Sequence, residues 1–279
     1  MMRLARALCA LALVTSALAP AARAGSLLRY GGRRGQVAVY RLSLSATGQQ
    51  VSLGERRPVA VEAEFELREE ITATGPAGTV TARVVPTMIS ARDSAGAFGN
   101  GERSVFPTIE VTIDERGQVL ATRPLSDEHI GPYQRAFASL MGAPGAVMPT
   151  GPAMVGDSWT WESDGSRQTS RLAAVRHGSY GVVARVETAM TAPIRLQEES
   201  VGLGLKTSMS GNETETSVLD MLVDTGVVLR SKGVARSATK GQVVLQLAHG
   251  PRAFLMASDI TVSFDLRLVR LDGKPIRSG

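Results

Sequence analysis

The side chains that could act as catalysts or metal ligands are few in this 279-residue chain, and they are widely spaced. The three histidines are His129, His177 and His249, and none has a second imidazole or a carboxylate at the spacing that a zinc site or an activated base needs. The stretch Ser208-Met-Ser-Gly211 lacks the Gly-x-Ser-x-Gly pattern of a hydrolase nucleophile. We therefore predict no catalytic residue, no metal site and no cofactor, and the sequence assigns no ligand-binding residue.

The acidic residues show no metal-binding pattern either. Asp220 and Asp224 offer oxygen ligands, but the carboxylate-rich loop of a calcium site is missing around them. Glu62, Glu64 and Glu66 alternate with apolar residues, and same-face neighbours along a strand are about 7 Å apart, which is unfavourable for joint ligation. This alternation indicates a solvent-exposed face of a strand.

The first residues have the pattern of a secretion signal. Arg3 and Arg6 precede an apolar core at 8–18, and small residues follow, so we predict cleavage between Ala24 and Gly25. The apolar core is short for a transmembrane helix, although an uncleaved anchor is the alternative. We expect a periplasmic or secreted protein with no transmembrane segment in the mature chain, which would span residues 25–279.

Cysteine content and charge exclude several classes of protein. Cys9 is the only cysteine and lies in the predicted signal, so the mature chain would have no disulfide, thiol nucleophile or cysteine-ligated metal. The net charge of +5 includes three arginines of the signal, which leaves 5 − 3 = +2. No basic run is interleaved with aromatic residues, so we exclude a nucleic-acid partner.

Alternating apolar and polar residues predict an all-β, mainly antiparallel fold. The segments with this pattern are 36–45, 59–71, 79–91 and 108–121 in the first half, and 158–162, 168–175, 181–192, 217–223, 227–236, 242–248, 253–256 and 260–271 in the second.

One amphipathic helix is expected between these halves, over residues 128–141. Its apolar positions follow helical spacing from Ile130 through Tyr133 and Phe137 to Met141, and Gly142 ends it. We predict four parts: a signal peptide (1–24), a first β lobe (25–125), the helix with a proline- and glycine-rich joint (126–157), and a second β lobe (158–279). The lobes would be curled sheets or sandwiches.

Two weak sequence repeats suggest that the lobes are related. Segment 82–91 is similar to 184–192, and segment 113–120 is similar to 223–229. Both pairs occur in the same order, about a hundred residues apart, which is the pattern of an internal duplication.

The stretch Pro152-Ala-Met-Val-Gly-Asp-Ser-Trp159, which begins in the joint, resembles a motif of secreted bacterial β-proteins of unknown function. In that family the motif follows a short helix, which is preceded by an Asp-x-x-Gly turn similar to Asp114–Gly117 here. The resemblance implies an exported β fold and no particular activity. We expect Asp157 to accept backbone N–H bonds in a turn and Trp159 to begin a strand. A more distant similarity is to periplasmic lipoprotein carriers, which have a curled antiparallel sheet and a helical lid.

Three hypotheses for function follow. The first is a non-enzymatic envelope protein that binds a lipid or another apolar ligand in a cavity of several hundred Å³, under a lid formed by 128–141. The second is an envelope scaffold that binds other proteins, with the same apolar residues tightly packed. The third is a hydrolase with scattered site residues, in which His177 or His249 would have to meet carboxylates across the fold. The oligomeric state is not predicted.

Overall fold

The computed structural model describes residues 25–52, 54–93, 96–98, 106–125, 145–200, 205–247 and 250–276. These residues form thirteen strands and a single 3-10 turn at Pro76–Gly78. The strands are β1 (Val37–Ser52), β2 (Glu55–Thr74), β3 (Val80–Asp93), β4 (Gly96–Phe98), β5 (Ile109–Ile113), β6 (Val119–Pro124), β7 (Ser158–Ser163), β8 (Ser166–Gly178), β9 (Gly181–Ser200), β10 (Leu205–Leu222), β11 (Val228–Leu247), β12 (Gly250–Leu271) and β13 (Lys274–Pro275).

All thirteen strands belong to one antiparallel sheet, which confirms the predicted all-β class. Its order is β6-β5-β3-β2-β1-β12-β11-β10-β9-β8-β7, with β4 beside β3 and β13 beside β12. The expectation of two separate lobes is not supported. The two halves of the chain form two meanders, and β1 pairs with β12 from Ala38↔Leu271 to Val51↔Ala257, so backbone hydrogen bonds join them into one sheet. The helix expected at 128–141 lies outside the described residues.

Several strands are longer than their sequence patterns indicated. We expected breaks near 237–241 and 257–259, but β11 and β12 run through both. At the second of these places Asp259 forms an ion pair with Arg236 of the neighbouring strand, so a residue typical of turns stabilises the sheet instead. The sequence pattern also did not predict strands at 193–200 and 205–216, which belong to β9 and β10.

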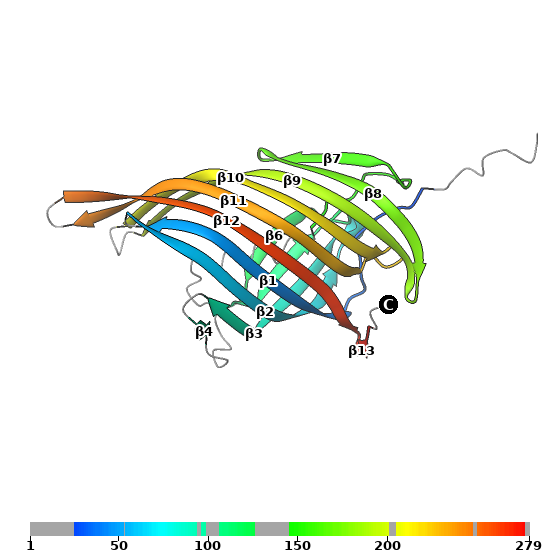
Figure 1. The fold of residues 1–279 in the computed structure, drawn as a ribbon. Coiled ribbons are helices and arrows are strands. Elements are labelled where there is room, and N and C mark those ends of the chain that lie inside the picture. The colour runs from blue at the N-terminus through cyan, green and yellow to red at the C-terminus, as the bar shows by residue number, and fades with distance from the viewer. Residues whose placement is uncertain are drawn as a thin grey trace, which may run out of the picture.

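The sheet is strongly curled. Figure 1 shows β1, β2 and β9–β12 as a long arch. One packed apolar cluster contains Ile109 and Val111 of β5 together with Val183 of β9 and Leu268 of β12, so strands distant in the sheet order meet through their inner faces. At Gly211 and Gly241 a side chain would collide with the backbone of the adjacent strand, and glycine at such positions permits tight bends.

Two irregular segments pack against the curled sheet. Residues 25–36 and the strap, which we define as residues 145–157, are joined by the Ser26↔Ala153 bridge. Leu28 and Met148, one from each segment, are fully buried in a second cluster against Leu172 and Leu219 of β8 and β10. The segments also reach the other half of the sheet, because the N–H of Tyr30 donates to the Glu115 carbonyl in the β5–β6 turn.

A cavity inside the curled sheet

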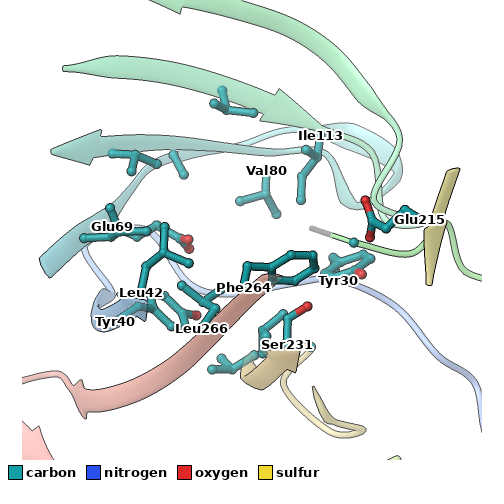
Figure 2. Close-up of a pocket in the computed structure, with 18 of the residues that line it drawn as sticks. Tyr30, Tyr40, Leu42, Glu69, Val80, Ile113, Glu215, Ser231, Phe264 and Leu266 are labelled. Carbon is teal, nitrogen blue, oxygen red and sulfur yellow. The ribbon is translucent and has the colours of Figure 1, made fainter. Parts of the chain in front are cut away.

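A cavity of about 530 Å³ lies within the curl. Strands β1, β2, β3, β5 and β9–β12 contribute lining residues, and the N-terminal segment, the strap and the β10–β11 turn add a few more. The lining is mostly aliphatic and aromatic. Figure 2 shows Leu42, Val80, Ile113, Phe264 and Leu266 directed toward a common space from strands β1, β3, β5 and β12.

Strand alternation and register explain why apolar side chains converge on this space. Every second residue of a strand faces the same side. Leu42 of β1 therefore lies beside Leu266 of β12 on one flank and Phe65 of β2 on the other. Phe264 of β12 lies opposite Gly233 of β11, where no side chain competes for space. The cavity is thus built from the core-facing positions of long strands.

The strap, of which Gly145 lines the cavity, is held in place through its own backbone. Each carbonyl from Gly145 to Thr150 accepts a hydrogen bond from a side chain of another segment, at 2.7–3.2 Å. The donors are, in order, Gln168, Tyr30, Trp159, Arg116 and Arg29, the last of which serves both Pro149 and Thr150. Irregular buried backbone needs such partners, because an unsatisfied carbonyl is costly away from water.

Three glutamates line the otherwise apolar cavity: Glu69 of β2, and Glu213 and Glu215 of β10. Burial raises the pKa of Glu69 to about 7. Burial also raises the pKa of Glu213 and of Glu215, and for Glu215 the neighbouring Glu213 charge adds to this while a hydrogen bond with Ser217 opposes it. Glu69 is nevertheless only partly buried, because part of its surface faces the cavity.

The hydroxyl groups near the cavity also respond to burial. The pKa of Tyr40 is raised well above its ordinary value, first by burial and then by the nearby charges of Glu69 and Tyr30. Burial likewise raises the pKa of Tyr30, although its hydrogen bond to the Ala146 carbonyl opposes the change. Both phenols are therefore neutral hydrogen-bonding groups at physiological pH.

The residues that drew attention in the sequence do not form this site. His177 is exposed near the β8–β9 turn, opposite Val182, while His129 and His249 lie outside the described residues. Asp220 is buried and forms a two-pronged ion pair with Arg185 at 2.8 and 2.9 Å. Among the described residues, no three metal-ligating side chains gather at one place.

Other sequence interpretations are confirmed. On a solvent-exposed face, Glu64 forms an ion pair with Arg41 of the neighbouring β1 at 3.4 Å, and Glu66 forms one with Arg270 of β12, the strand beyond β1, at 3.3 Å. In the strap, Asp157 accepts a hydrogen bond from the Met154 N–H at 2.8 Å, and β7 begins one residue before Trp159.

Sequence reasoning missed the three cavity glutamates, although one signal was available. Glu69 occupies the same alternation as Phe65, Leu67 and Ile71, so a carboxyl group stands at an apolar position of β2. Glu213 had no comparable signal, because the strand that contains it was not recognised.

Comparison with known proteins gives no family for the chain: no family model matches it, and no curated protein does. Among solved structures, a lipovitellin structure described under lipid–protein interactions aligns with a TM-score of 0.42 at 11% identity, over 88% of this chain but 26% of the lipovitellin chain.

Two bacterial proteins of solved structure also align over 88% of this chain. OccK2 of Pseudomonas aeruginosa, in complex with glucuronate, gives a TM-score of 0.23 at 8% identity over 100% of its length. An outer membrane channel of Pseudomonas putida F1 gives 0.22 at 9% identity over 98%. All three TM-scores lie below 0.5, so the likenesses say nothing about what this chain binds. In the described part of the chain, no helix has the length and apolarity to cross a membrane.

Proposed function

We propose that this protein is an exported, non-enzymatic component of the cell envelope that binds a lipid or another apolar molecule inside its curled sheet. One observation carries the proposal: the inner face forms a cavity of about 530 Å³ that is lined mainly by apolar side chains. Sites for small molecules have volumes of roughly 300–1,000 Å³ and are mostly apolar with a few polar groups. The scaffold hypothesis instead expected tight packing of the same face.

The construction of the cavity supports a holding role. Its walls come from long paired strands, and the strap is fixed by side-chain hydrogen bonds rather than by packing alone. Rigid elements of this kind keep a cavity open without requiring a ligand for folding. Export and periplasmic location remain predictions from the signal pattern at residues 1–24.

A cavity-filling substitution tests the proposal. Ala235 of β11 lines the cavity, and Ala238, three residues further along the same strand, is exposed. We expect Ala235→Phe to abolish the fluorescence gain of N-phenyl-1-naphthylamine, an apolar probe, because the added ring occupies the binding space. Ala238→Phe should bind the probe as the unaltered chain does.

Circular dichroism and urea unfolding would establish that both variants fold. The proposal fails if the unaltered chain does not bind the probe, or if folded Ala235→Phe binds it as well as Ala238→Phe does.

A further inference from the structure

Among the described residues, the charged side chains that line the cavity are all acidic. They are Glu69, Glu213 and Glu215, and none of the lining residues in the described part of the chain is Lys, Arg or His. A site for a fatty acid or a phospholipid headgroup would need a cation or several hydrogen-bond donors to hold the anion. This cavity offers carboxyl groups instead.

Several acidic residues elsewhere on the sheet do have a cationic partner. Glu64 and Asp265 on the outer face, and the buried Asp220, each form an ion pair with at least one arginine. None of the arginines and lysines in the described ranges forms an ion pair with a cavity glutamate, and burial alone accounts for the raised pKa of Glu69. A desolvated carboxyl group without a cationic partner is costly, and such groups concentrate at functional sites.

The geometry gives a ligand two polar contact regions separated by apolar wall. Figure 2 shows Glu69 and Glu215 on opposite sides of the space, with Phe264 and Tyr30 between them in this view. Glu213 and Glu215 face the same side of β10, about 7 Å apart by strand geometry. Glu215 has a hydrogen bond with Ser217, whereas Glu69 and Glu213 have no hydrogen bond or ion pair among the described residues, so these two carboxyl groups are the ones most open to a ligand. Of the two, Glu69 has the pKa that burial raises furthest, to about 7.

We propose that the cavity selects an amphiphile that combines an aliphatic body with a protonated amine, and that Glu69 is the principal partner of the ammonium group. This inference rests on the proposed function and specifies its ligand. Glu213 and Glu215 add to the negative potential, which attracts the ammonium group and disfavours carboxylate- and phosphate-bearing amphiphiles.

Binding of an amine should also depend on pH. The titratable groups that face Glu69 are Tyr40 from β1, Tyr30 from the N-terminal segment, and the two glutamates of β10, whereas Arg83 on the adjacent β3 is exposed. The tyrosines stay neutral, so the carboxyl groups set the response. An ammonium group favours the carboxylate, so its affinity should rise as Glu69 loses its proton near pH 7.

The test compares three ligands of equal chain length, dodecylamine, dodecanol and lauric acid, as competitors of N-phenyl-1-naphthylamine at pH 5.5 and pH 8. At pH 8 we expect dodecylamine to bind at least about tenfold more tightly than dodecanol, because one hydrogen bond between charged groups contributes a free energy that corresponds to at least this difference in affinity. Lauric acid should be the weakest. The preference for the amine should shrink at pH 5.5.

Variants locate the selectivity. Glu69→Gln should lose most of the amine preference and its pH dependence while retaining dodecanol binding. The matched control is Glu187→Gln, since Glu187 is exposed on the outer face of β9, and it should behave as the unaltered chain does. If Glu69→Gln does not fold, the pH dependence of amine binding to the unaltered chain still tests whether the cavity prefers an ammonium group.

Equal affinity for the amine and the alcohol at pH 8, or tighter binding of lauric acid, would overturn this inference and leave the proposed function standing. Failure of all three ligands to compete, together with no binding of the probe itself, would overturn both.

Discussion

Glu69→Gln should change how the stability of the fold depends on pH. The pKa of Glu69 is raised from 4.5 to about 7 by burial. A carboxyl group with a raised folded-state pKa favours folding in full below the unfolded value, near 4.5, and this contribution is lost as pH rises through about 7. At about 1.4 kcal/mol for each pH unit between the two values, the loss is about 3 kcal/mol at pH 8.

Glutamine has a similar shape and does not titrate, so the variant escapes this loss. We expect the free energy of unfolding of Glu69→Gln, minus that of the unaltered chain, to increase by about 3 kcal/mol between pH 4.5 and pH 8. Urea unfolding followed by the fluorescence of Trp159 and Trp161 would measure both, without added ligand. Glu187→Gln should show a difference that changes by less than about 0.5 kcal/mol.

A constant offset between Glu69→Gln and the unaltered chain across this pH range would refute the reasoning. It would mean that water or a side chain outside the described residues solvates the Glu69 carboxyl group.

Two further predictions concern the curl and the strap. Gly211→Ala should destabilise the fold by about 1–3 kcal/mol, because the added methyl group would collide with the Ala238 carbonyl of β11. Gly151→Ala, where nothing lies within 4 Å, is its control, and equal urea midpoints for the two variants would argue against a bend that requires glycine. Tyr30→Phe should cost about 1–3 kcal/mol by leaving the buried Ala146 carbonyl without its donor, and an unchanged midpoint would show that the strap is held in another way.

The fold class could be predicted from the sequence because period-two alternation is a local property. It is clear in β2, where Phe65 and Leu67 face the core while Glu66 faces an arginine of β12. The Val-Gly-Asp turn could be predicted for the same reason, since Asp157 bonds to the backbone three residues away.

The union of the two halves could not be predicted, because it depends on pairing between β1 and β12, more than two hundred residues apart. The breaks expected in β11 and β12 were wrong, because glycine and aspartate mark turns only when no neighbouring strand satisfies them. Gly241 lies against the backbone of β10, and Asp259 pairs with Arg236.

The sequence predicted a cavity of several hundred Å³ on a concave apolar face, but it did not predict the acidic residues that line this cavity. Glu69 could have been noticed as a charged residue in the apolar alternation of β2. Glu213 and Glu215 could not, because β10 carries polar residues on both faces over 206–217, and only the curl of the sheet turns one of those faces into a cavity wall.

The measurement that tests the central claim most directly is native mass spectrometry of the exported chain, followed by organic extraction and lipid analysis. The account predicts a near-stoichiometric bound molecule with an aliphatic body, present on the unaltered chain and on Ala238→Phe and absent from Ala235→Phe. A mass without ligand for all three, unchanged after exposure to dodecylamine and to extracted lipids, would contradict it.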